Sequence, residues 1–220
     1  NLDDSVELGT RNIKLALRRL RKFARSGAAE ELDMPDTIRC TAKNAGLLDL
    51  RMVPERHNTV KVLLFFDVGG SMDPHVRTCE QLFSAARTEF KHMEYFYFHN
   101  FIYDSVWRNN MRRQSEKIPT IDILHKYPHD YKVIVVGDAS MSPYEILQPG
   151  GSIEHWNEES GEQWVRRVAE TYAKLVWLNP IAEDHWEFSQ SIDITRRLVE
   201  DRMFPMTLKG MEEAMGYLSR

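Results

Sequence analysis

Two stretches of the chain are apolar at almost every position and then end in an aspartate. VKVLLFF precedes Asp67, and KVIVVG precedes Asp138. A half-buried strand alternates apolar and polar residues, so an unbroken apolar run of this length predicts a strand covered on both faces. LVWL at residues 175–178 has the same character. These runs predict parallel strands enclosed by helices.

Helical patterns alternate with these strands from residue 61 onward. Helices are predicted at about 74–91, at IDILHKY, around 164–172, at IDITRRLVEDR and from about Leu208 to the C-terminus. Further strands are predicted at MEYFYFHN, DSVW and MFP, with DSVW at an edge. The alternation predicts an α/β three-layer sandwich around a mainly parallel, doubly wound sheet with an antiparallel edge strand. We assign residues 61–220 to this domain.

Residues 1–60 have a different character and are assigned to a lead-in segment. RNIKLALRRLRKFAR, residues 11–25, carries seven Lys and Arg, no acid and interleaved apolar residues, which predicts a basic amphipathic helix. It could be a docking arm for an acidic partner, a membrane surface or RNA. Because the basic run is local and acids flank it, we favour a surface helix. Asp36 is predicted to cap a short helix that ends at Gly46, and LLDLRMV to form an edge strand.

Composition narrows the class of protein without identifying it. The 220 residues are 42% apolar and 28% charged, as in a soluble globular protein, and the formal net charge of −4 gives no reason to expect nucleic acid. No apolar stretch approaches the roughly 20 residues that span a bilayer. The chain opens with polar and acidic residues rather than a secretory signal, and two distant cysteines make no disulfide framework. A cytoplasmic location is therefore expected.

The aspartates at the two strand ends are the main candidate site. In open parallel sheets, sites form at the carboxyl ends of strands where the strand order reverses, so Asp67 and Asp138 would share a crevice if their strands are neighbours. Ser71 starts the next helix, and Gly69 and Gly70 let the backbone turn tightly. Carboxylates and hydroxyls without soft ligands suit a hard cation such as Mg²⁺ or Mn²⁺. The alternative is two ordinary strand ends and a Ser N-cap.

The stretch from Asp67 to Ser71, DVGGS, resembles the Asp-x-Ser-x-Ser motif of the metal-ion-dependent adhesion site (MIDAS) of von Willebrand factor A (VWA) domains. The order of elements over 61–220 fits that domain, and the basic lead-in, KVLLFFDVGGSM and TLKGMEEAM are similar to its bacterial CoxE-like branch. The resemblance implies a metal held by Asp67, Ser71, the later Asp138 and a loop threonine, for which Thr120 is the candidate. Thr120 could equally cap the short helix that follows it.

Gly69 is the position at which the sequence departs from this motif, which expects a serine there. One hydroxyl ligand is missing, and a water molecule could replace it because Mg²⁺ keeps several waters. We expect a weaker site, or one that a partner completes; the other possibility is that the metal site is lost. Asp73 is close enough to add a carboxylate, although Asp73-Pro74 also fits an ordinary helix start.

Two further features adjoin the predicted crevice. The loop at residues 139–158 follows Asp138 directly, and long loops at this edge of a sheet carry binding functions or are disordered. Exposed aromatic residues often anchor interfaces. Tyr144, Trp156 and Trp164 therefore favour a loop that forms a wall of the crevice or a partner-docking surface over a family-specific surface insertion without function. His99 and Asn100 could line the same crevice, although a structural histidine is the favoured interpretation of His99.

The favoured hypothesis is a non-catalytic protein-binding module whose bound cation is completed by an acidic group of a partner. The CoxE-like resemblance implies a MoxR-type AAA+ ATPase partner and a role in maturing or remodelling enzyme complexes. The alternatives are a metal-dependent phosphoester hydrolase at the same carboxylates and a structural domain with a vestigial site. A dehalogenase-like phosphatase is disfavoured because Gly69 stands where its second Asp belongs, and the sequence has no Walker spacing or zincin pattern.

Overall fold

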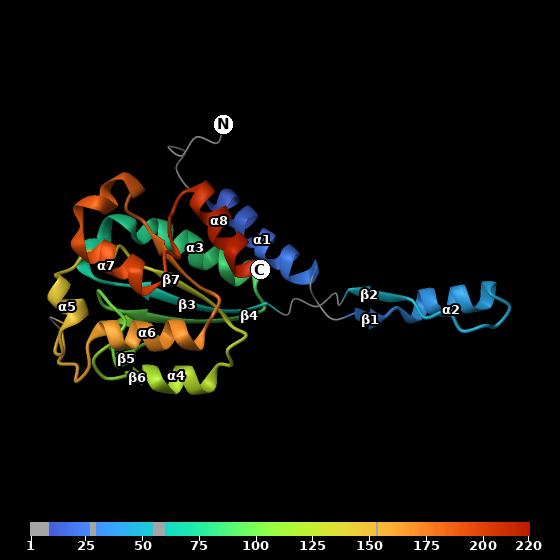
Figure 1. Ribbon diagram of the computed structural model, residues 1–220, viewed down its shortest axis with the longest axis horizontal. Helices are drawn as coiled ribbons and strands as arrows, with labels where there is room; N and C mark the ends of the chain where they lie inside the picture. The colour runs from blue at the N-terminus through green and yellow to red at the C-terminus, as the bar shows by residue number, and fades with distance from the viewer. Residues whose placement is uncertain (1–8, 27–29, 55–59, 153) are drawn as a thin grey trace.

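A five-stranded parallel sheet forms the centre of the protein in a computed structural model, which describes residues 9–26, 30–54, 60–152 and 154–220 (Figure 1). The strands lie in the order β4–β3–β7–β8–β9, and every neighbouring pair is parallel. The bounds are β3 (Lys61–Asp67), β4 (His92–Phe98), β7 (Lys132–Val136), β8 (Leu175–Asn179) and β9 (Met203–Pro205). The strands predicted from the apolar runs are confirmed.

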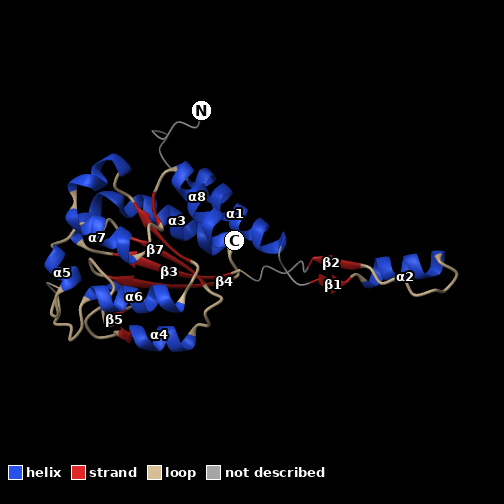
Figure 2. Ribbon diagram, in the orientation of Figure 1, coloured by secondary structure: helices blue, strands red, loops and turns tan. Residues whose placement is uncertain are grey.

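Helices cover both faces of the sheet (Figure 2). One face is covered by α1 (Thr10–Ser26), α3 (Val76–Glu89) and α8 (Leu208–Ser219), and the other by α4 (Thr120–Lys126), α6 (Gly161–Thr171) and α7 (Gln190–Leu198). The predicted α/β three-layer sandwich is therefore confirmed. Among the described residues, none of the helices combines the length and the apolar character needed to cross a bilayer.

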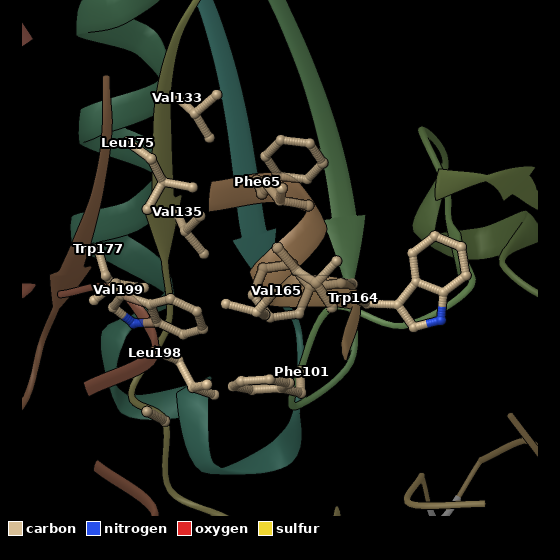
Figure 3. Close-up of a cluster of buried hydrophobic side chains, with 14 of the residues drawn as sticks. Phe65, Phe101, Val133, Val135, Trp164, Val165, Leu175, Trp177, Leu198 and Val199 are labelled. Carbon is tan, nitrogen blue, oxygen red and sulfur yellow. The ribbon is translucent and has the colours of Figure 1, made fainter. Parts of the chain in front are cut away.

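Strand β3 shows why the central strands are apolar at every position. Val62, Leu64 and Phe66 contribute to the core beneath α1, α3 and α8. Leu63 and Phe65 point to the opposite core, where they lie with side chains of β7, β8, α6 and α7 (Figure 3). All five are at most 4% exposed. Because both faces of the strand are buried, alternation would place polar groups in one of the two cores.

Helix α1 packs into the layer that α3 and α8 form. Its apolar stripe is fully buried, and its arginines reach acids on the neighbouring helices: Arg18 and Arg21 pair with Glu89 of α3, and Arg19 pairs with Glu212 of α8. The buried members of the stripe are Ile13, Ala16, Leu17 and Leu20. The acids that α1 contacts therefore come from helices distant in sequence. The acidic residues before position 9 lie outside the described residues.

A small unit between α1 and β3 lies apart from the main sheet (Figure 1). It consists of β1 (Glu30–Leu32), α2 (Met34–Lys43) and β2 (Met52–Pro54), with β1 and β2 antiparallel. Of the stretch LLDLRMV, which was predicted to form an edge strand, only the last two residues belong to β2. This strand pairs with β1 rather than with the main sheet. Asp33, not Asp36, caps α2, since the Asp33 carboxylate accepts the backbone N–H of Asp36 at 3.0 Å.

Antiparallel pairing occurs beside the β4 edge of the main sheet. β5 (Ser105–Val106) pairs with β6 (Ile118–Pro119), and Trp107 forms a single antiparallel bridge with Tyr97 of β4. The antiparallel edge strand predicted at DSVW is therefore not a full strand of the main sheet. It pairs with β6 and contacts β4 through the Trp107 bridge. The remaining elements are η1 (Gly70–His75), η2 (Asn110–Arg112), α5 (Pro143–Leu147) and η3 (Glu183–Phe188).

Candidate metal centre

The candidate site lies where the strand order of the sheet reverses. After β3 the chain forms β4 on one side of it, and the next strand of the sheet, β7, pairs with β3 on its other side. Asp67 is the last residue of β3, and Asp138 follows the end of β7 by two residues. The expectation that the two strands are neighbours is confirmed, so both aspartates lie at the carboxyl edge that usually holds ligands in such sheets.

One carboxylate oxygen of Asp67 accepts two hydrogen bonds, and the other accepts none from the described residues. The carboxylate is 4% exposed, and its Oδ1 accepts the backbone N–H groups of Gly69 at 2.8 Å and Asn100 at 2.9 Å. Its Oδ2 is buried and has no hydrogen-bond partner among the described residues. A buried polar atom without a partner costs about 1–3 kcal/mol, so an orphaned carboxylate oxygen at a strand end indicates a ligand position.

The crevice concentrates negative charge. Burial raises the pKa of Asp67 from 3.8 to about 7; the N–H of Gly69 opposes this shift, and the nearby Asp138 carboxylate adds to it. The N–H of Asn100 also lowers this pKa, and the carboxylate of Glu145 raises it further. Because like charges and desolvation disfavour the ionised form, a cation beside Asp67 would stabilise it.

Asp138 is held by the turn that follows β7. Its side chain is 1% exposed, Oδ1 accepts the N–H of Ser140 at 2.9 Å, and its backbone carbonyl accepts a hydrogen bond from Asn179 at 2.9 Å. Ala139, between Asp138 and Ser140, has a φ of 52°. A non-glycine residue in this left-handed region is uncommon and is found at functional turns. The turn therefore fixes the position of the second carboxylate.

The segment after Asp67 forms the 3₁₀ helix η1, and the predicted helix start shifts from Pro74 to Val76. Gly69 is the N-cap of η1 with an ordinary φ of −62°, so backbone geometry alone does not require glycine there. Ser71 and Asp73 are both exposed on η1. Asp73 also lines the pocket beside Asp67, and the roles of both residues as ligands stay predictions.

Thr120 is placed differently from the other candidates. It is fully buried, its hydroxyl donates to the carbonyl of Tyr103 at 2.6 Å, and its N–H donates to the carbonyl of Asp104 at 2.7 Å. Pro119, not Thr120, occupies the N-cap of α4. The hydroxyl therefore joins α4 to the segment after β4. Its assignment as the loop ligand stays a prediction.

Asn100 and Glu145 form a polar contact beside Asp67. The Asn100 side-chain amide donates to Glu145 Oε2 at 3.0 Å, and Glu145 is 8% exposed. Asn100 was expected at the crevice, whereas Glu145 was missed. Ser142 and Glu145 form a capping box at the start of α5, and this Ser-x-x-Glu spacing could have predicted the helix. The spacing gives no sign that the second Glu145 oxygen reaches the crevice.

A pocket of about 320 Å³ opens beside the Asp67 side chain, between α3 and the β4 edge. Gly69, Asp73, Cys79 and Glu80 are among its lining residues. Burial raises the pKa of the Cys79 thiol to about 12, so this cysteine stays protonated at neutral pH in the metal-free protein. The charged donors around Asp67 are therefore carboxylate oxygens, those of Asp73 and Glu80 among them.

The ligand set for a cation cannot be made of carboxylates alone. Among the described residues, no three His, Cys, Asp or Glu side chains are grouped so that they could hold a metal ion. A cation at Asp67 would need hydroxyl, amide or water oxygens in addition, and Mg²⁺ accepts such a mixed set. The residues present fit a hard cation of this kind, because an unsatisfied carboxylate oxygen and neutral oxygens lie at one strand end.

Exposed aromatic residues follow the same edge of the sheet. Tyr144 on α5 is 74% exposed and Trp156 in the next loop is 75% exposed, so both are accessible, and their part in docking stays a prediction. Trp164 is buried at the edge of the core, so its prediction as a docking residue is wrong (Figure 3). Phe188 in η3, after β8, is 78% exposed and was not anticipated.

A parallel sheet with helices on both faces, and with a crevice at its switch point, is a VWA-like α/β fold. Residues 7–106 match the family model described as VWA domain containing CoxE-like protein. This match supports a CoxE-like VWA domain, and the matched range begins before α1 and ends with β5. No curated protein and no solved structure matched the chain.

Proposed function

We propose that the protein is a non-catalytic, cytoplasmic binding module that recognises an acidic group of a protein partner through a divalent cation, Mg²⁺ or Mn²⁺. The observation that carries the proposal is the orphaned Oδ2 of Asp67, a buried carboxylate oxygen at the switch point of the sheet. A VWA domain is a type of module that commonly mediates protein interactions. Within this domain, the crevice is where such recognition would occur.

Three residues have defined roles in this proposal. Asp67 supplies a direct carboxylate ligand, Ser71 on η1 supplies a hydroxyl, and Asp138 supports the site from the end of β7. When bound, the cation supplies positive charge and an open position for a partner's carboxylate. The two N–H groups on Asp67 Oδ1 hold the carboxylate in place, so that Oδ2 is the oxygen left for the ligand.

The exposed aromatic residues would give the interaction its specificity. Tyr144, Trp156 and Phe188 lie on segments that follow β7 and β8, on the carboxyl side of the sheet. Such residues are over-represented among those that contribute most to binding at interfaces. We therefore place the partner's contact surface on these segments around the crevice. The CoxE-like domain makes a MoxR-type AAA+ ATPase the partner to test, with remodelling of an enzyme complex as the joint activity.

The test is capture of that ATPase from a lysate of the native host by the immobilised protein, in Mg²⁺ and in EDTA. We expect the ATPase to be recovered in Mg²⁺ and to fall at least tenfold in EDTA and with Asp67→Asn. Asp122→Asn, a change of an exposed acid on α4, is the matched control and should leave recovery unchanged.

Three results would contradict the proposal. Equal capture in Mg²⁺, in EDTA and with Asp67→Asn would keep the partner but remove the metal from its recognition. Absence of the ATPase under all conditions would remove the partner. Turnover of a phosphoester that is lost with Asp67→Asn would favour the hydrolase alternative.

A further inference from the structure

We infer that the side-chain oxygen of Asn100 replaces the serine hydroxyl that Gly69 lacks, and that it is a ligand of the cation. The inference rests on the proposed metal site and concerns how this chain completes it. A Cβ atom built on Gly69 would lie 2.3 Å from Asn100 Oδ1 and 3.2 Å from Asp67 Oδ1. The space that a serine side chain would take is thus already occupied by an oxygen from the end of β4.

The orientation of the Asn100 amide is fixed by its other partner. The Nδ2 group donates to Glu145 Oε2 at 3.0 Å. An ionised carboxylate only accepts hydrogen bonds, so the amide nitrogen must face Glu145 and the oxygen must face Gly69. Glu145 is itself held by the capping box of α5, in which its Oε1 accepts the N–H of Ser142. The amide oxygen is therefore aimed before any ligand binds.

The backbone at Asn100 holds the residue against the aspartate. Its N–H donates to Asp67 Oδ1 at 2.9 Å, the same oxygen that accepts the N–H of Gly69. Its φ is 59°, in the left-handed region that asparagine adopts more readily than most residues. Asparagine thus meets two requirements here: a backbone of this shape and a side-chain oxygen directed at Gly69.

The exchange is chemically conservative for a hard cation. Hydroxyl and amide carbonyl oxygens are both neutral, hard ligands, so replacing one by the other leaves the charge of the ligand set unchanged. The departure at Gly69 is then no sign of a vestigial site. A side chain at residue 69 would meet the amide oxygen of Asn100, so serine there would displace this amide from Glu145.

The inference is tested by Mn²⁺ binding to the full chain, followed by the electron paramagnetic resonance signal of free Mn²⁺. The variants are Asn100→Gly, Gly69→Ser and the two combined. Asn100→Gly keeps the backbone N–H and suits the positive φ, so we expect an intact fold. Its affinity for Mn²⁺ should be lower than that of the original chain by a factor of about ten or more. The double variant should recover affinity to within about threefold of the original chain, because the serine then has room for its hydroxyl.

Thermal unfolding in EDTA separates ligand loss from misfolding. Gly69→Ser alone should lower the melting temperature, whereas Gly69→Ser in the Asn100→Gly background should not, since the overlap at 2.3 Å is gone. If the original chain and Asn100→Gly bind Mn²⁺ equally, the role of Asn100 is overturned and the metal site stands. A double variant no better than Asn100→Gly would also overturn it. If the original chain binds no Mn²⁺, the metal site and this inference fail together.

Discussion

Replacing Asp67 with asparagine is expected to make the metal-free protein more stable at pH 8, although it removes the central residue of the site. Burial raises the pKa of Asp67 to about 7 in the folded state, against 3.8 for an unperturbed aspartate. With a folded pKa above the unfolded one, the carboxyl contributes stability that is fully present below pH 3.8 and is lost as the pH rises through 7. Above pH 7 the folded protein holds a buried negative charge, which asparagine lacks.

The size of the effect follows from the same pKa shift. Between pH 5 and pH 8, titration of Asp67 should lower the free energy of unfolding by about 2–3 kcal/mol. Denaturant unfolding in EDTA at the two pH values would show this loss in the original chain, with a smaller loss in Asp67→Asn. Adding Mg²⁺ at pH 8 should stabilise the original chain and leave Asp67→Asn unchanged. Equal pH dependence of the two proteins would show that Asp67 is not the titrating group.

Two glycines of α8 should respond in opposite ways to alanine. Gly210, in the TLKGMEEAM stretch, lies against Pro205 of β9, and an added Cβ would lie 2.1 Å from the Pro205 carbonyl oxygen. Backbone cannot move aside as a side chain can, so Gly210→Ala should destabilise the protein by about 2–3 kcal/mol. Gly216 has no atom within 4 Å of an added Cβ, so Gly216→Ala should stabilise by about 0.5–1 kcal/mol through helix propensity.

Chemical denaturation of the two variants measures this difference directly. The expected result is a large loss for Gly210→Ala beside a small gain for Gly216→Ala, although both changes are favourable by propensity alone. This result would show that the close packing of α8 on β9 requires a glycine at residue 210, within the stretch that resembles CoxE-like proteins. A gain of similar size in both variants would contradict the close approach of Gly210 to Pro205.

The sheet could be predicted from the sequence because its signal is local. Unbroken apolar runs before Asp67 and Asp138 follow from burial on both faces, and residues adjacent in sequence show it. The sequence also predicted that both aspartates lie at one edge of the sheet, because their strands were expected to be neighbours. The basic helix at residues 11–25 was predicted for the same reason, since helical periodicity is local.

The features that the sequence did not predict depend on contacts between distant residues. The Arg18 and Glu89 pair joins positions 71 apart, and the amide contact from Asn100 to Glu145 joins positions 45 apart. No local pattern carries such pairings. For the same reason, the sequence predicted the loss of a metal ligand at Gly69. The oxygen that lies where a residue 69 side chain would be comes from Asn100, after the end of another strand.

The central claim is that Asp67 holds a divalent cation, and Mg²⁺ binding measured by isothermal titration calorimetry at pH 8 tests it most directly. At this pH most Asp67 carboxyls are ionised, so protons compete little with the metal. The account predicts one Mg²⁺ site in the original chain, unchanged in Asp122→Asn and weakened at least a hundredfold in Asp67→Asn. Absence of Mg²⁺ binding by the original chain, or equal binding by Asp67→Asn, would contradict it.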